Sequence, residues 1–269
     1  MISKTEQIEK FLFLSDLHGD FNKFSSAVFW GLAKNYTVYI LGDLVDSFKH
    51  SRKNQLKCLE LLLALKDNLK VKYLLGNHEL SYLFLDHRAT GHSKAFQAQS
   101  VNKLRILQKQ AEPAFSLKLD PAGNVSFNSS GLGTGYKSIL MTHAGLNPAL
   151  VPLGQLATPF EWIKAEYELN KFRFYTKHDL SKVGFGSGGF TPNGGIFWGR
   201  PYEEWDYGFT GIIQIFGHSY TDSLHFDKDR SSVNLDVKEN SILTLYKRTN
   251  LVTNTVKYEF KTRTARTYM

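Results

Sequence analysis

The sequence contains one cysteine, so no disulfide can form within the chain. A lone thiol suits a reducing compartment. No stretch approaches the roughly 18 apolar residues that a membrane-spanning helix needs, and the N-terminus lacks the apolar block of a secretory signal. We therefore expect a cytoplasmic protein with no membrane partner. The 269 residues, 42% of them apolar, are enough to bury a sizeable core.

The sequence has fewer acidic than basic residues, 25 against 33, which gives a formal net charge of +8. A basic surface attracts phosphate-bearing partners such as nucleotides or nucleic acid. The simpler interpretation is a solvated surface with a denser basic C-terminal tail from about residue 257. No repeat, low-complexity segment or linker interrupts the chain, and residues 1–269 are therefore predicted to form a single domain.

Five short apolar segments each lead into a glycine, a potential metal ligand, or both. The segments are 11–15, 36–41, 71–75, 137–142 and 212–216, and the residues that follow them are Asp16 and His18, Asp43, Asn77 and His78, His143, and His218. Short apolar runs of this kind are typical of buried strands. Helical patterns separate the first three, which predicts parallel neighbours whose carboxyl ends lie together.

The remaining elements are predicted from amphipathic spacing and turn residues. We expect helices from an Asp20 cap to about Lys34 and over 54–66, 93–110 and 158–175, a hairpin over 115–127, an irregular glycine-rich loop over 184–199, and three strands over 232–260. Cys58 falls inside the second helix, where an apolar setting favours a packed thiol over a nucleophile.

The polar residues at the strand ends have the chemistry of a metal site. Asp16 and His18 are two positions apart and would face the same side of a strand. Asp43 has two carboxylate oxygens that could bridge two ions. Each histidine alone is more simply a buried ring, but five such strand ends in one chain favour metal binding. Oxygen and imidazole ligands without thiolates suit Mn, Fe, Zn, Co or Ni, and two ions can clamp a phosphoryl group.

The ordered motifs resemble the calcineurin-like metallophosphoesterase superfamily. They are DLHG at 16–19, GDLVD at 42–46, GNHE at 76–79, HAG at 143–145 and GH at 217–218, and NLD at 234–236 looks like a closing strand. The nearest resemblance is to the branch of serine/threonine phosphoprotein phosphatases and bacterial or phage diadenosine tetraphosphate hydrolases. It implies an α/β fold, a β-sandwich of two mixed sheets flanked by helices in four layers (αββα).

The same resemblance implies a role for each motif residue. Asp16, His18 and Asp43 would hold one divalent ion. Asp43, Asn77, His143 and His218 would hold the other, and manganese is the first candidate metal. His78 would protonate the leaving oxygen and Asp46 would orient it, while a hydroxide between the ions attacks phosphorus. Glu79 is expected to have a structural role at the start of its helix.

One position departs from the family pattern. Members of the phosphatase branch usually carry arginine directly after the second aspartate of GDLVD, whereas this chain has Ser47. Arg52 or Arg88 could replace that arginine, and Arg200, in a Trp-Gly-Arg segment similar to that of bacterial and phage members, is the better candidate to bind substrate phosphate. An exposed surface arginine is the plain alternative.

The missing arginine and the positive charge favour a nucleotide or nucleic-acid-end phosphate as substrate. A serine/threonine protein phosphatase and a diadenosine polyphosphate hydrolase are the alternatives, and a metal-retaining nucleic-acid-binding scaffold is the non-enzymatic one. A group of aromatic residues could stack a nucleobase, although packing is the commoner use of such residues. They are Phe190, Phe197, Trp198, Tyr202 and Trp205.

Overall fold

The computed structural model describes residues 5–84, 89–152, 158–170, 174–238 and 241–264, which form twelve strands and six α-helices. The strands are β1 Glu6–Leu14, β2 Thr37–Ile40, β3 Val71–Tyr73, β4 Phe115–Lys118, β5 Asn124–Phe127, β6 Ser130–Gly133, β7 Ser138–Met141, β8 Ile212–Phe216, β9 Phe226–Asp227, β10 Ser232–Asn234, β11 Ser241–Asn250 and β12 Thr255–Thr264. The helices are α1 Phe21–Ala33, α2 Arg52–Leu65, α3 Asn77–Leu83, α4 Lys94–Gln108, α5 Pro159–Leu169 and α6 Pro201–Glu204.

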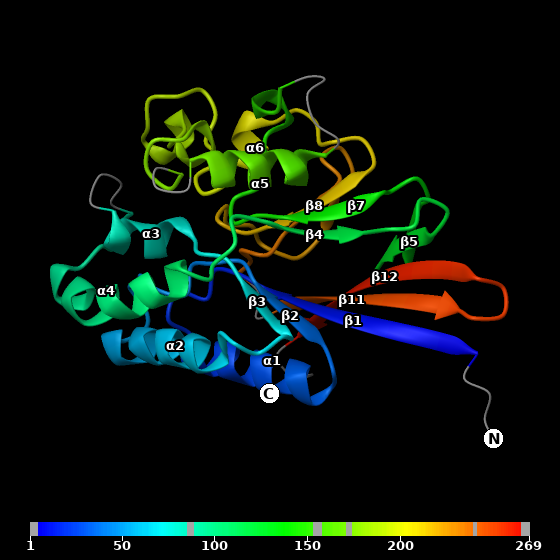
Figure 1. Cartoon of the computed structure of the whole chain (residues 1–269), viewed down its shortest axis with the longest axis horizontal. Helices are drawn as coiled ribbons and strands as arrows, with labels where there is room; N and C mark the ends of the chain where they lie inside the picture. The colour runs from blue at the N-terminus through cyan, green and yellow to red at the C-terminus, as the bar shows by residue number, and fades with distance from the viewer. Residues whose placement is uncertain (1–4, 85–88, 153–157, 171–173, 239–240, 265–269) are drawn as a thin grey trace.

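The strands form two mixed sheets packed face to face. One has seven strands in the order β3-β2-β1-β11-β12-β5-β6, and the other has five in the order β4-β7-β8-β10-β9. Figure 1 shows α1 and α2 on the outer side of the larger sheet, and α5 and α6 on the outer side of the smaller one. This arrangement confirms the predicted sandwich of two mixed sheets between layers of helices.

Side-chain alternation along β1 explains the layering. Phe13 faces the space between the sheets, whereas its neighbours Leu12 and Leu14 pack toward the helices, and all three are buried. Strands that are apolar on both faces need cover on both sides, which the second sheet and the helices provide. The Cys58 thiol lies buried in the helical layer, and burial raises its pKa to about 12, as expected for a packed thiol.

Polar caps fix where the long helices begin. Asp20, Ser51, Ser93 and Thr158 each accept a hydrogen bond from the backbone N–H three residues on. The first helix therefore begins as predicted. The helix predicted over 158–175 is wrong at its end, because α5 stops at Leu169, where Asn170 Nδ2 donates to the Glu166 carbonyl. None of the helices in the described ranges is long and apolar enough to cross a membrane.

Two further predictions are corrected. Residues 115–127 do not form a hairpin, because β4 pairs with β7 in the smaller sheet while β5 pairs with β12 and β6 in the larger one. The segment between them therefore crosses from one sheet to the other. The basic residues from 257 to 264 form strand β12, hydrogen-bonded between β11 and β5, rather than a tail. Residues 265–269 lie outside the described part of the chain.

Candidate metal centre

The turns that follow β1, β2 and β8 carry predicted site residues in an unusual backbone conformation. Asp16, His18, Asp43, Asp46 and His218 all have positive φ, between 42° and 68°. Such values are uncommon for residues with a Cβ and are often found where function requires a fixed side-chain position. Half of the ten non-glycine residues with positive φ in the described chain belong to this set.

Two glycines allow these turns to approach one another. A Cβ on Gly217 would overlap the Asp16 carboxylate, and a Cβ on Gly76 would overlap that of Asp43. The glycines next to the candidate ligands are thus required by close packing between turns from different strands. This packing brings residues far apart in the sequence to one place: the His218 N–H donates to Asp16 at 3.0 Å, and the His78 N–H donates to Asp43 at 3.0 Å.

Two groups of potential ligand atoms meet at Asp43. One consists of His18, Asp43 and His78, and the other of Asp43, His143 and His218, with the ligand atoms of each group within 4.8 Å of one another. Asp43 Oδ2 is 3.4 Å from His143 Nε2 and 3.9 Å from His78 Nε2. A carboxylate shared by two groups is placed as the predicted bridging ligand would be.

The other two predicted ligands lie beside these groups. Asp16 Oδ1 is 3.9 Å from His18 Nε2, and Asn77 Oδ1 is 2.8 Å from His143 Nε2 and 2.9 Å from His218 Nδ1. The structure therefore brings all six predicted ligands together. It also places His78, which was predicted as an acid and not as a ligand, close to Asp43.

Hydrogen bonds to backbone carbonyls orient two of the imidazole rings. His18 Nδ1 lies 2.9 Å from the Val45 carbonyl oxygen, and His143 Nδ1 lies 2.7 Å from that of Leu41. A carbonyl can only accept, so Nδ1 carries a proton in both rings and Nε2 is the nitrogen that faces the centre. This is the outer-shell arrangement that commonly orients metal-ligating histidines.

The electrostatics of the donor set fit a cation. Burial and the nearby Asp43 carboxylate raise the pKa of Asp16, and burial together with Asp16 raises the pKa of Asp236 to about 8. Burial and His143 lower the pKa of His218 to about 3, which keeps this ring neutral. A divalent cation would stabilise buried carboxylates that repel one another, and the neutral His218 ring can ligate it. Burial lowers the pKa of His143, but the Asp43 carboxylate outweighs burial and raises this pKa to about 10, so the His143 ring would release a proton when it binds a metal.

A second set of contacts fixes Asp46 beside His78. The Asp46 Oδ2 atom is 3.0 Å from His78 Nδ1, its Oδ1 accepts the Tyr82 hydroxyl, and its backbone N–H donates to Gln55 Oε1 at 3.0 Å. Burial lowers the pKa of His78, but the Asp43 charge and the Asp46 hydrogen bond outweigh it and raise the pKa to about 9. His78 can therefore hold a proton next to the centre.

Comparison with known proteins gives the family. A model of the calcineurin-like phosphoesterases matches residues 9–222, which is most of the chain and includes every predicted ligand. The chain belongs to the calcineurin-like phosphoesterase family. It is accordingly a hydrolase that acts on phosphate esters, and the fold described above agrees with this assignment.

Two solved structures that match the chain are distant from it in sequence. A protein serine/threonine phosphatase from Saccharomyces cerevisiae is 14% identical with a TM-score of 0.44, over 96% of this chain and 80% of the other. A Staphylococcus aureus structure named "Putative 5′-Nucleotidase" is also 14% identical, with a TM-score of 0.41, over 95% of this chain and 54% of the other. No curated protein sequence matches the chain significantly.

Glu79 of the GNHE motif has the predicted structural role in this phosphoesterase. Its carboxylate is buried and accepts hydrogen bonds from the backbone N–H groups of Gly76, Asp43, Leu44 and Val45, at 2.7 to 3.1 Å. The side chain thus ties the start of α3 to the turn that carries Asp43. Its pKa is raised by burial and by Asp43, against the lowering effect of these backbone donors.

Two residues that hold Asp46 beside His78 were not predicted from the sequence, namely Tyr82 and Gln55. Tyr82 lies four positions after His78 on α3, so both side chains are on one face of the helix and reach the same carboxylate. The spacing of four residues between His78 and Tyr82 is visible in the sequence and could have identified Tyr82. No sequence pattern could have identified Gln55, because it belongs to α2 and meets Asp46 only in the folded chain.

Ser47, which occupies the position of the arginine in the family pattern, has a local structural role in this chain. Ser47 Oγ accepts hydrogen bonds from the N–H groups of Lys49 and His50, at 3.0 and 2.8 Å, and so stabilises the turn after Asp46. Arg52 is exposed at the start of α2. Arg88 lies outside the described residues.

Arg200 lies near the centre at the start of α6. Its Nε donates to Ser187 Oγ at 3.2 Å and its Nη1 to Glu203 at 2.9 Å, and its charge contributes to the lowered pKa of His218. The side chain is 40% exposed, so a ligand can reach the guanidinium. The glycine-rich region before it forms short turns, including a 3₁₀ turn at Phe185–Ser187, as the predicted irregular loop implies.

Of the two roles considered for the neighbouring aromatic residues, most of them have the commoner one, which is packing, and not nucleobase stacking. Phe197, Trp198 and Trp205 are buried, and the Tyr202 ring is covered by the Arg230 guanidinium, 5.5 Å from its centroid. The Trp198 ring instead packs against His218, with centroids 5.9 Å apart. Phe190 is the only exposed residue of the five aromatic residues considered, and the other four pack against neighbouring side chains.

Proposed function

We propose that this phosphoesterase works with two divalent metal ions. The observation that carries the proposal is Asp43, whose carboxylate belongs to both groups of ligand atoms. Asp16, His18 and Asp43 would hold one ion, and Asp43, Asn77, His143 and His218 the other. When bound, two such ions neutralise phosphoryl charge and activate water for attack. The donor set of oxygens and imidazoles makes manganese the first metal to test.

The remaining residues of the site would move a proton and hold the substrate. His78 would give the proton on its Nε2 to the leaving oxygen, and Asp46 would hold the ring through Nδ1 in the orientation this transfer needs. Tyr82 and Gln55 would keep Asp46 from turning away. No side chain of this set needs to form a covalent intermediate.

For the substrate we propose a nucleotide or a nucleic-acid-end phosphate. Support comes from the net charge of +8 and from Ser47, which stands where the protein phosphatase branch has a phosphate-binding arginine. Protein phosphatase and diadenosine polyphosphate hydrolase activities remain the rival proposals. The buried state of most of the aromatic residues removes stacking as an argument for any of them.

A substrate panel with added Mn²⁺ tests this proposal. We expect turnover of p-nitrophenyl phosphate or its bis ester, and among natural substrates selective turnover of 2′,3′-cyclic nucleotides or phosphorylated RNA ends. Preferred hydrolysis of phosphopeptides or of diadenosine tetraphosphate would instead select one of the rivals. Stoichiometric metal binding without turnover of any substrate would identify a metal-retaining scaffold.

Arg200 is proposed to bind the substrate phosphate. Replacing it with alanine is expected to raise KM about tenfold or more and to change kcat less, because a charge-assisted contact made equally in the ground and transition states is lost. Steady-state kinetics on the best substrate of the panel measures this. Arg105→Ala, in the last turn of α4, is the matched control and should leave KM unchanged. An unchanged KM for Arg200→Ala would assign Arg200 to the surface.

A further inference from the structure

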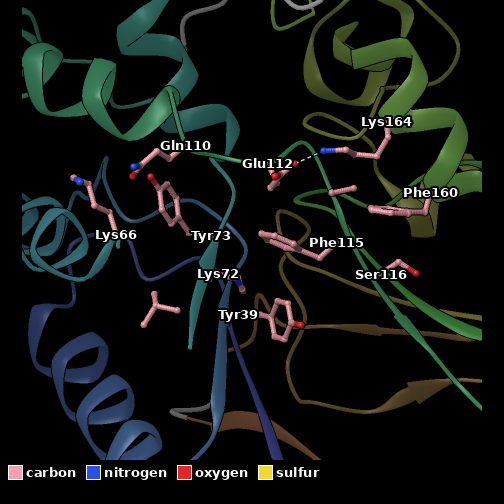
Figure 2. Close-up of a pocket in the computed structure, with 12 residues that line it drawn as sticks. Tyr39, Lys66, Lys72, Tyr73, Gln110, Glu112, Phe115, Ser116, Phe160 and Lys164 are labelled. Atoms are coloured by element: carbon pink, nitrogen blue, oxygen red, sulfur yellow. Dashed lines mark hydrogen bonds and ion pairs between the residues drawn. The ribbon is translucent and has the colours of Figure 1, made fainter. Parts of the chain in front are cut away.

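A groove lies between the free edges of the two sheets, where β3 ends one sheet and β4 ends the other. Its volume is about 330 Å³, which is within the range of small-molecule sites. Figure 2 shows Tyr39, Lys72 and Phe115 in its middle, with Lys66 on one side and Phe160 and Lys164 on the other. None of the metal-centre residues lines it.

Aromatic rings form the apolar part of this groove. Tyr39 from β2 is anchored in the inter-sheet core by stacking on Phe13, with centroids 5.6 Å apart. Phe115 from β4 packs edge-on against Tyr39 at 5.3 Å, and Phe160 from α5 lines the groove on the side of the smaller sheet. Phe115 and Phe160 are both partly exposed. The groove therefore offers aromatic surface, held in place by the core behind it, to a planar ring.

Three lysines line the groove, and they differ in their partners. Lys66 pairs with Asp67 at one end, and Lys164 pairs with Glu112 at the other. The side chain of Lys72, in the middle of β3, has no hydrogen-bond or ion-pair partner among the residues that the structure describes, whereas its backbone pairs with β2. Two other polar side chains of the lining already have partners, because Tyr73 donates to the Leu107 carbonyl and Gln110 to Asp67.

We propose that the groove binds a small aromatic anion of the nucleotide class, as a site separate from the metal centre. The ring would lie against Phe115 and Phe160. The phosphate would accept hydrogen bonds from Lys72, whose ammonium is a compact donor suited to phosphate. The charges of Lys66 and Lys164 are offset by Asp67 and Glu112, with which they pair, so the positive charge that the groove offers to a phosphate is that of Lys72.

There is an alternative explanation for Lys72. A lysine on an edge strand can have the single role of preventing edge-to-edge association between sheets. That role requires charge at the edge but neither an aromatic wall nor a concave site. The two explanations therefore differ in ligand binding, and a test must separate recognition of the ring from recognition of the charge.

Calorimetric titration with AMP, adenosine and ribose 5-phosphate makes this separation. AMP is expected to bind the metal-loaded chain and to keep one binding site after chelator is added, because the groove contains no predicted metal ligand. Adenosine and ribose 5-phosphate should each bind this site about tenfold more weakly than AMP, since each lacks one half of the recognised chemistry. Loss of all AMP binding on chelation would place the nucleotide at the metal centre and refute the groove site.

Substitutions at Lys72 test the assigned contact. Lys72→Met should weaken AMP binding to the chelated protein about tenfold, and Lys72→Arg should restore most of it because the charge is kept. Lys118→Met removes a lysine from β4 that is exposed and does not line the groove, so it should leave the affinity unchanged. Equal AMP affinity for wild type and Lys72→Met would leave Lys72 with edge protection alone and overturn the proposal.

Discussion

Replacing Asp43 with asparagine is expected to lower kcat/KM by more than about 10³-fold and to reduce the bound metal from two ions per chain to one or none. The reason is that Asp43 is the only carboxylate shared by the two groups of ligand atoms. Asparagine keeps the shape but offers one neutral oxygen, so it cannot bridge two cations, and the loss of several kcal/mol of transition-state stabilisation corresponds to that factor. Metal content by mass spectrometry and steady-state kinetics measure the two effects.

Asp46→Asn is the matched control for this substitution. Asp46 is also a buried aspartate with positive φ, only three residues away, but its carboxylate bonds to His78 Nδ1 and belongs to neither group of ligand atoms. It should therefore lose activity while keeping both metal ions. Retention of two ions by Asp43→Asn would contradict the bridging role, and circular dichroism of both variants establishes that each one has folded.

The location of the site was predictable because it depends on a local rule. In a buried sheet with helical crossovers, polar residues directly after the strands collect at one edge. The motifs at 16–19 and 42–46 follow the neighbouring parallel strands β1 and β2, so this rule brings them together. The motif at 217–218 follows β8 of the other sheet and reaches Asp16 through the packing of the two sheets. The structural use of Glu79 was also predictable, because it occupies the third position of a helix whose first N–H groups need acceptors.

The predictions that were wrong concern contacts between segments that are far apart in the sequence. Residues 115–127 have the turn chemistry of a hairpin, yet Phe115 pairs with Met141 and Phe127 with Phe260, and no local pattern identifies those partners. The basic C-terminal residues likewise looked solvent-exposed because their pairing with β5, more than a hundred residues earlier, is invisible in the sequence. Strand pairing is decided by tertiary burial, which overrides local preference.

The identity of the ligands to each ion is also not decided by sequence order. Motif resemblance assigns Asp16 to the ion held by His18 and Asp43, whereas the compact group around His18 in the structure contains His78. Asp16 Oδ1 is 3.9 Å from His18 Nε2, and His78 Nε2 is equally far, 3.9 Å, from Asp43 Oδ2. The role of His78 as acid or as ligand therefore needs a measurement that separates metal content from proton transfer.

Replacing His78 with alanine makes that separation. We expect kcat to fall by about 10²- to 10⁴-fold with both metal ions retained, which is the usual contribution of a positioned general acid. The fall should be largest for alkyl phosphate esters and smaller for p-nitrophenyl phosphate, because p-nitrophenolate leaves readily without a proton. Parallel kinetics on the two ester types, with metal content measured on the same samples, tests both points.

Two further variants connect this result to the contacts around Asp46. Asp46→Asn should reproduce the dependence on leaving group, since it removes the carboxylate that orients His78 Nδ1, and Tyr82→Phe should show the same pattern more weakly, because His78 keeps its own bond to Asp46. A ligand role would have a different signature. If His78→Ala loses a metal ion and slows both esters equally, then His78 completes the group around His18, and the proton for the leaving oxygen must come from another donor.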